Sequence, residues 1–241
     1  VAKSYILYRR KRAEIRKEKQ IVLDKNEIDE VDKRFDVNAL RVLKSRYLRK
    51  NPDGKVVESP KDLFERVAVH IALPEILYSE KVYKKIKNSN QNKPYKSDWS
   101  DMEKIEIESE KFSSFEGRLK IGKYALNRFH IKFLYKAFLR FEKQGFTSIT
   151  FKELLKKLQN NEFKSLEKTI DDFYELMVSK KFMPNTPTIA NFGNFLGMGS
   201  ACFALDVEDS IESIMGTLKD AATIFKSGGG LGYNFSKLRP K

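Results

Sequence analysis

Apolar residues recur at helical spacing along most of the chain up to residue 182. The clearest run begins at Ser59, which is the predicted N-cap, with Pro60 as the first helical residue and a buried apolar face after it. That face comprises Leu63, Phe64, Val67, Ala68 and Ile71, with Arg66 and His70 on or beside it. The same spacing predicts helices over residues 2–19, 37–50, 124–143, 151–158 and 165–181, with Asp36 and Ser165 as caps and Gly145 as a stop. Polar links are predicted before residue 36 and over residues 80–102, and no strand alternation precedes Ser200.

The pattern changes near Ser200. Residues 200–205 have strand composition, residues 211–225 return to helical spacing, and residues 231–235 resemble a second strand. We expect the helix to start at a capping-box pair, Asp209 and Glu212, and to bury its apolar face. That face comprises Ile211, Ile214, Met215, Leu218, Ala222 and Phe225. The last sixty residues therefore predict one strand-helix-strand unit.

Three consecutive glycines, Gly228 to Gly230, separate this helix from the second strand. A phosphate-binding loop needs a strand before its glycines and a helix N-terminus after them, and the order here is the reverse. The run therefore indicates either a plain helix stop or a backbone that must approach a ligand or another segment closely.

Composition narrows the class of protein. A chain of 241 residues that is 41% hydrophobic can support one or two ordinary domains. No apolar run is long enough to span a membrane and the first residues lack a signal-peptide pattern, so a cytoplasmic location is expected. A single cysteine, Cys202, excludes an internal disulfide and a cysteine-rich metal site. His70 and His130, without a clustered carboxylate motif, are predicted to be packed or surface residues rather than ligands of a metal.

The net charge of +14 raises nucleic acid as a rival partner. Lysines and arginines are nevertheless interleaved with acidic residues throughout, as on solvated helix faces, and no basic motif interleaved with aromatic residues stands out. We therefore expect no nucleic-acid partner. A basic surface also suits substrates and effectors that carry di- or triphosphates.

Five motifs follow one another in the last sixty residues: PNTPT at 184–188, GSACF at 199–203, VEDSI at 207–211, KSGGG at 226–230 and NFSKLRP at 234–240. Together they resemble the start of the catalytic domain of ribonucleotide reductase, specifically the adenosylcobalamin-dependent class. The resemblance implies a mainly α N-terminal domain followed by the first strand-helix-strand unit of an incomplete ten-stranded α/β barrel. The corresponding domains are residues 21–182 and 183–241. Residues 1–20 resemble the tail of an ATP-binding regulatory cone, or are a linker.

The resemblance also implies roles for single residues. Cys202 matches the first cysteine of a pair that gives two electrons to the ribose and becomes a disulfide. Substrate contacts are implied for Thr186, Ala201, Cys202 and Gly230, with Thr186 in place of the serine usual in the class. Contacts with a specificity effector are implied for Asp209, Ser210, Ile211 and Arg239. No residue of the chain is predicted to bind a metal.

The rest of the family's machinery, including the radical cysteine and the second redox cysteine, would follow Lys241. We therefore expect a piece of the enzyme that is inactive alone: a truncation, half of a split protein, or a segment beside an intervening element. Implied partners are ribonucleotide substrate, dNTP or ATP effectors, a thioredoxin-like reductant, a complementary chain with the rest of the barrel, and a second copy in a homodimer. Adenosylcobalamin is the implied cofactor, with its site mostly outside this chain. The alternative is a non-catalytic helical nucleotide-binding or assembly module.

Overall fold

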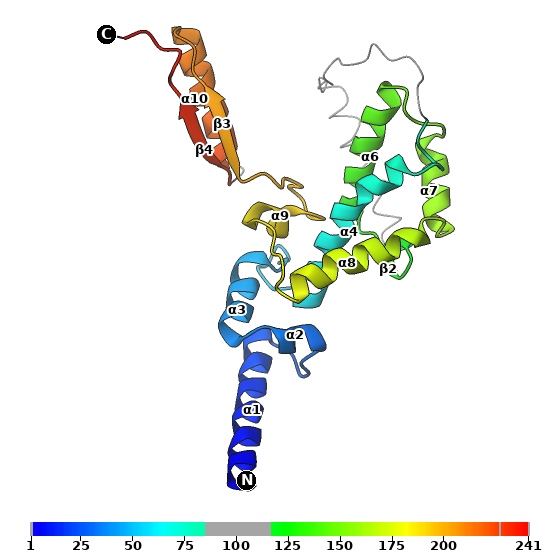
Figure 1. Ribbon diagram of the computed structural model, residues 1–241, viewed down its shortest axis with the longest axis vertical. Helices are drawn as coiled ribbons and strands as arrows, with labels where there is room; N and C mark the ends of the chain where they lie inside the picture. Colours follow the sequence, from blue (N-terminus) through cyan, green and yellow to red (C-terminus); the bar gives the residue numbers. More distant parts are fainter. Residues whose placement is uncertain (1, 85–116, 227, 241) are drawn as a thin grey trace.

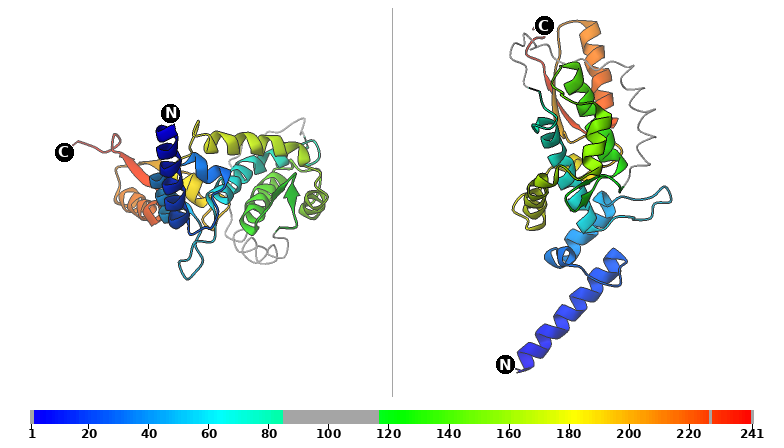
Figure 2. Two further views of the ribbon diagram at one scale, coloured as in Figure 1. Left: turned by 90° about the horizontal axis from the view of Figure 1, so that it is seen from below. Right: turned by 90° about the vertical axis from the view of Figure 1, so that its right-hand side faces the viewer.

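The computed structural model describes residues 2–84, 117–226 and 228–240, and Figure 1 shows an elongated arrangement of three parts. Helix α1 (Ala2–Leu23) projects at one end, the helices around α4 form the middle, and the last two strands with helix α10 lie at the other end (Figures 1 and 2). None of the described helices is long and apolar enough to cross a membrane.

Helix α4 (Pro60–Tyr78) is the centre of the helical part. Its predicted start is confirmed, because Ser59 Oγ accepts the Asp62 N–H at 3.2 Å while the Asp62 carboxylate accepts the Ser59 N–H at 3.0 Å. Helices α6 (Arg128–Lys143) and α8 (Glu167–Val178) pack on it. The fully buried large side chains lie mainly on these elements; they include Leu63, Phe64, Leu73, Ile76, Leu77, Ile131, Leu134 and Phe138.

The segment before α6 is a hairpin, so two predictions are wrong. Strand β1 (Lys120–Ile121) pairs antiparallel with β2 (Tyr124–Ala125), which places strands before Ser200 and removes Tyr124 from the predicted helix. Gly122 makes the turn with a φ of +59°. Helix α6 begins only at Arg128, because the Asn127 side chain accepts the N–H groups of the next turn.

Other helix boundaries also differ from the predictions. The helix expected over residues 37–50 is α3 (Val37–Val42) continued by a π-helix, η1 (Leu43–Tyr47), and a further helix α2 (Glu30–Arg34) occupies the predicted polar link. Ser165 is not a cap: it lies in a 3-10 turn, η3 (Lys164–Leu166), that leads directly into α8. Lys180, with a φ of +63°, ends the predicted helix before residue 181. Helix α7 (Phe151–Gln159) is confirmed, and residues 85–102 of the predicted link lie outside the described residues.

One more helix, α9 (Thr186–Asn191), begins within the PNTPT motif. The Asn185 side chain caps it by accepting the Thr188 N–H at 3.1 Å, and Pro187 occupies its first turn, where a missing N–H costs nothing. Pro187 therefore helps to start this helix.

The strand-helix-strand unit is confirmed. Strand β3 (Cys202–Asp206) pairs in parallel with β4 (Gly230–Asn234), and α10 (Ile211–Lys226) connects them. The predicted cap is one residue off: Ser210 Oγ, rather than Asp209, accepts from the helix, at 3.1 Å from the Ser213 N–H. Ser213 Oγ in turn accepts the Glu208 N–H at 3.0 Å.

The apolar face of α10 was predicted to be buried and is exposed. The helix turns Thr217 and Ala221 to the strands, whereas Leu218 is 61% exposed and Phe225 is 56% exposed. Two strands can cover only one narrow side of a helix, so nothing within the described residues covers the second side. The main hydrophobic core of the described residues includes no side chain after Phe192, and Val207 and Ala221 are buried apart from it in the strand-helix-strand unit.

Candidate functional site

Three of the residues implied in substrate binding come together at one end of the strand pair. Cys202 and Gly230 are the first residues of the two parallel strands and are paired with each other. The Gly230 N–H donates to the Ala201 C=O at 2.6 Å. The Cys202 thiol is free and exposed. The sheet register therefore puts an accessible thiol beside a glycine backbone.

The glycine run serves both of the purposes that were left open. Gly228, with a φ of +83°, ends α10, and its N–H donates to the Phe225 C=O at 3.0 Å. At Gly229 an added Cβ would lie 2.8 Å from Ile224 Cγ2 and 2.9 Å from Phe203 Cε2, so helix and strand approach too closely there for any side chain. The run leads into a strand and not into a helix N-terminus, which leaves no phosphate-loop geometry.

Thr186 is the first residue of α9, and its hydroxyl lies 3.1 Å from the Tyr47 hydroxyl at the end of η1. The chain after α9 folds back along it. Thr188 Oγ1 donates to the Gly199 C=O at 3.1 Å, and an added Cβ at Gly199 would lie 2.5 Å from the Phe192 ring. The helix that carries Thr186 is thus tied to the segment that enters β3.

The residues implied in effector binding lie at the opposite, carboxyl end of the strands. Arg239 Nε is 3.2 Å from Asp209 Oδ2, so these two predicted residues meet. Ser210 caps α10, and Ile211 is its first residue and 72% exposed. Four residue steps of roughly 3.3 Å separate the two ends, or roughly 13 Å.

Lys237 forms ion pairs with two carboxylates at this end of the strands. Lys237 Nζ lies 3.2 Å from Asp206 Oδ2 and 2.5 Å from Glu208 Oε1. Hydrogen bonds to these two carboxylates raise the pKa of Lys237, and hydrogen bonds from Asn234 and Lys237 lower the pKa of Asp206. Together with Asp209, Arg239 and the first turn of α10, these groups form a solvent-facing set in which two cations are paired with three carboxylates.

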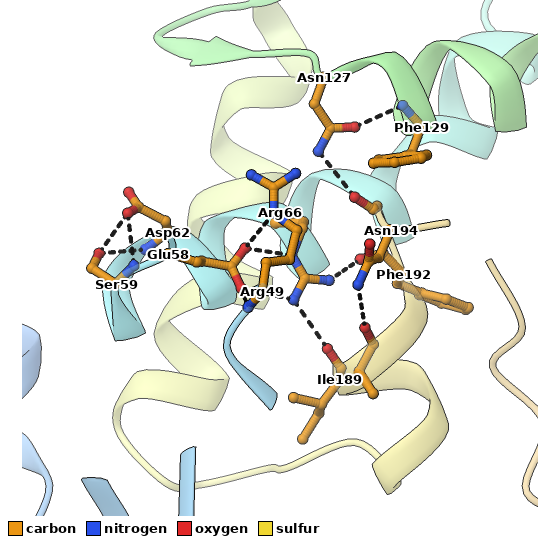
Figure 3. A network of polar contacts seen from close by, with 12 residues as sticks. Arg49, Glu58, Ser59, Asp62, Arg66, Asn127, Phe129, Ile189, Phe192 and Asn194 are labelled. Atoms are coloured by element: carbon orange, nitrogen blue, oxygen red, sulfur yellow. Dashed lines mark hydrogen bonds and ion pairs between the residues drawn. The ribbon is translucent and has the colours of Figure 1, made fainter. Parts of the chain in front are cut away.

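A buried polar cluster joins α4 and α6 to the chain after α9 (Figure 3). Arg66 Nε donates to Glu58 Oε1 at 2.7 Å, and both side chains are almost fully buried. The Arg66 guanidinium also donates to the carbonyl oxygens of Ile189, at 3.4 Å, and of Phe192. These carbonyls are at the C-terminal end of α9, where a cation is favourable.

Two histidines complete this cluster, and of the two predicted alternatives, packed or on the surface, both are packed. His70 Nδ1 accepts the Gly193 N–H at 3.0 Å, and His130 Nε2 lies 3.0 Å from the Arg66 C=O. Burial lowers the pKa of each histidine to about 3, with Arg66 adding to the effect at His70 and the neighbouring His70 at His130. Both rings are therefore neutral near pH 7.

The sequence interpretation gave this cluster no role. One signal was available: Arg66 and His70 are four residues apart on the apolar face of α4, where an isolated polar residue would be costly. Arg66 contacts Glu58 and His130, and His70 accepts from Gly193, whose carbonyl in turn accepts from Asn127. These partners come from three other segments. No sequence spacing links those segments.

Two models of known protein families match this chain. A family model described as the ribonucleotide reductase all-alpha domain matches residues 33–197, and one described as the ribonucleotide reductase barrel domain matches residues 200–241. The chain belongs to the ribonucleotide reductase family. The resemblance inferred from the five motifs is therefore confirmed, as is the expected order of a helical domain and the start of a barrel domain.

Individual reductases show the same relationship. The vitamin B12-dependent ribonucleoside-diphosphate reductase of Thermoplasma acidophilum is 41% identical over 241 residues, which is 100% of this chain and 27% of that protein. The enzyme of the same name from Mycobacterium tuberculosis is 48% identical over 68 residues, 28% of this chain and 10% of that protein. The ribonucleoside-diphosphate reductase subunit alpha of Synechocystis is 40% identical over 67 residues, 28% of this chain and 9% of that protein. The chain thus spans about a quarter of the length of its Thermoplasma relative.

The described residues do not fit a corrin cofactor by themselves. Two concave sites among them, of about 580 and 350 Å³, are open and lined largely by charged and polar side chains, and neither adjoins Cys202. Within the same residues, no group of three or more His, Cys, Asp or Glu side chains could hold a metal ion.

Proposed function

We propose that the chain supplies a redox cysteine, substrate-binding segments and part of an effector site to a ribonucleoside-diphosphate reductase. The observation that carries this proposal is the pairing of Cys202 with Gly230 at the start of two parallel strands. An exposed thiol beside a backbone without a side chain leaves room for a sugar to approach the sulfur. The Thr186 hydroxyl and the backbone at Ala201 supply polar groups for the same ligand.

In the proposed reaction the ribose loses its 2′-hydroxyl as water. Two thiols, one of them that of Cys202, are oxidised to a disulfide and provide the two electrons and two protons. A carbon–oxygen bond breaks and a carbon–hydrogen bond forms at the sugar. The second thiol and the radical cysteine belong to parts of the enzyme outside residues 1–241, so the chain alone is proposed to be inactive, and a complementary segment with the rest of the barrel is its necessary partner.

The effector site is proposed at the carboxyl end of β3 and β4. Arg239 suits the phosphates of a dNTP or ATP, the Asp209 carboxylate can accept hydrogen bonds from a ribose, and Ser210 and Ile211 present the first turn of α10. The helix also offers a surface for a second copy of the enzyme. Its exposed apolar residues follow the alternating four- and three-residue spacing of paired helices: Ile211, Met215, Leu218, Ala222 and Phe225. This stripe supports a homodimer with the effector site beside the interface.

Other features of the whole enzyme are proposed from its relatives. Two of them are named vitamin B12-dependent reductases, which supports adenosylcobalamin as the cofactor, although the Synechocystis relative carries no such term. A disulfide formed at Cys202 needs reduction, for which a thioredoxin-like protein in the cytoplasm is suitable. Residues 1–20 are proposed to be the tail of an ATP-cone-like domain or a linker, and no nucleic acid or membrane is proposed as a partner.

Replacing the thiol tests this function. Cys202→Ser in the complete enzyme should abolish multiple turnover of a ribonucleoside diphosphate with a protein reductant, while the cofactor-derived radical still forms. Thr223→Ala, an exposed change on α10, is the matched control and should retain turnover. Turnover near the parent rate in the Cys202 variant would make the cysteine structural and would favour a non-catalytic nucleotide-binding or assembly module.

A further inference from the structure

Gly193 is the corner between α9 and the loop that leads to Cys202, and it is buried among polar side chains of the helical domain. Both of its backbone groups are used. Its N–H donates to His70 Nδ1 at 3.0 Å, and its C=O accepts from Asn127 Nδ2 at 3.0 Å. The corner is thereby held in one register against α4 and the start of α6.

The space around this corner admits no side chain. Gly193 has a φ of +66°, and an added Cβ would lie 2.4 Å from His130 Nε2 and 2.5 Å from Arg66 Cγ. By contrast, Gly197, in the same loop, has a φ of +63° and nothing within 4 Å of an added Cβ. The backbone conformation of the two glycines is nearly the same, so the tight fit is special to Gly193.

The polar groups around the corner hold one another in place. Arg66 donates to the last carbonyls of α9 and is itself held by Glu58 Oε1 at 2.7 Å. The Asn127 N–H donates to His130 Nδ1 at 3.3 Å, which leaves His130 Nε2–H to donate to the Arg66 C=O. Burying charges and amides in this way costs more free energy than burying apolar side chains. The hydrogen bonds between them hold the cluster in one geometry.

The other end of α9 is also held by the helical domain, through the Tyr47 hydroxyl 3.1 Å from the Thr186 hydroxyl. Beyond the corner, Asn191 Nδ2 donates to the Met198 C=O at 3.0 Å and Thr188 Oγ1 to the Gly199 C=O at 3.1 Å. Side chains therefore hold both ends of α9, the corner and the backbone at Met198 and Gly199, and Gly193 at the corner is buried.

We propose that Glu58, Arg66, His70, Asn127 and His130, here called the Gly193 socket, are positioning residues that hold residues 186–202 so that Thr186 and Cys202 meet one substrate. This inference rests on the proposed function of those two residues. The socket touches no reacting atom and acts through the placement of α9 and the loop behind it. A displacement of about 1 Å at such a distance can cost about a hundredfold in rate.

The first test compares two glycines in the complete enzyme, with CDP as the substrate. Gly193→Ala should lower kcat/KM by about 10- to 100-fold, whereas Gly197→Ala, which carries the same backbone strain in open space, should lower it by less than about threefold. Binding of dTTP at the effector site should be the same in both. Equal kcat/KM values for the two variants would overturn the proposal.

The second test separates hydrogen bonding from packing. His70→Leu fills the space against Phe133 and Phe192 but removes the acceptor for the Gly193 N–H, whereas His70→Asn keeps a side-chain acceptor and leaves a gap. A packing role ranks the Leu variant above the Asn variant in kcat/KM. The positioning role ranks them in the opposite order, by about tenfold, and a Leu variant as active as the Asn variant or more so would contradict it.

Hydrogen exchange tests the positioning role of the Gly193 socket separately from the proposed function. In the same enzymes, Gly193→Ala and His70→Leu should speed exchange of the amides in residues 186–199 by about tenfold and leave α10 unchanged. If the parent enzyme reduces no ribonucleotide, the proposed function fails and the exchange result still decides whether the socket holds this segment. Unchanged exchange in both variants would show that it does not.

Discussion

The helical domain around α4 and the strand-helix-strand unit of β3, α10 and β4 use similar sequence patterns with opposite outcomes. In α6 the apolar positions Leu134 and Phe138 are fully buried, whereas in α10 the equivalent positions Leu218 and Phe225 are more than half exposed. In the helical domain even charged groups such as Arg66 and Glu58 are buried and paired. In the other unit the ion pair of Asp209 and Arg239 faces solvent.

The difference shows that periodicity tells which face of a helix is apolar but not what covers it. Helix α6 meets α4, and its Phe138 packs on Phe151 of α7, so its face is enclosed by elements of this chain. Within the described residues, helix α10 packs on the strand pair, and the side of the helix that carries Leu218 is exposed. The helical domain therefore holds its own core, while the strand-helix-strand unit depends on what is added to it.

The largest expected contrast comes from removing one phenylalanine ring in each region. Phe138→Ala should lower the free energy of unfolding by about 3–5 kcal/mol, because it leaves a cavity in a closed core. Phe225→Ala should change it by less than about 0.5 kcal/mol in this chain, because that ring is already in water. Urea unfolding followed by circular dichroism measures both, and equal effects would remove the distinction between the two regions.

Hydrogen exchange of the unmutated chain should show the same contrast without a substitution. Amides of α4 should be protected about 100- to 1,000-fold more than those of β4, because an edge-exposed pair of strands opens locally at little cost. Strong protection of residues 200–239 in the isolated monomer would show that this unit folds without further strands. The proposal that it requires a complementary segment would then lose its physical support.

Acid should destabilise the helical domain through its two buried histidines. Their pKa is about 3 in the fold and about 6.5 when unfolded, so the unfolded chain binds more protons between these values. The contribution of the two histidines to the free energy of unfolding is fully present above about pH 6.5. It falls as the pH drops towards 3, by at most about 1.4 kcal/mol per pH unit for each histidine. Unfolding curves between pH 7 and 5.5 test this, and His70→Asn should roughly halve the slope.

The smallest effect on stability is expected at the exposed ion pair. Arg239→Ala should change the free energy of unfolding by less than about 1 kcal/mol, because Arg239 is mostly in water and its attraction to Asp209 is screened. In the complete enzyme the same change should weaken dTTP binding at least tenfold. Calorimetry of dTTP binding decides the second point, and unchanged affinity would remove Arg239 from the proposed effector site.

Local signals predicted much of this fold. Ser59 and Pro60 predicted the start of α4, and Gly228 predicted the end of α10. The change of period near Ser200 predicted the first strand of the barrel domain. Two of the misplaced helix boundaries lie where a residue near the predicted start acts as the helix cap, as Asn127 does for α6 and Ser210 for α10. Asn127 starts α6 after a hairpin that has only two residues in each strand, too short to show alternation.

The family, the cysteine and the glycine run can be identified from the amino-acid sequence, because each depends on residue types at fixed short spacing. Which residues meet becomes visible only in the packed fold. The pairing of Cys202 with Gly230, the contact of Asp209 with Arg239 and the burial of Gly193 against Arg66, His70 and His130 all join positions far apart in the chain. Such contacts depend on how helices and strands pack. Packing energy arises between the surfaces of two elements, so the sequence of one segment does not reveal it.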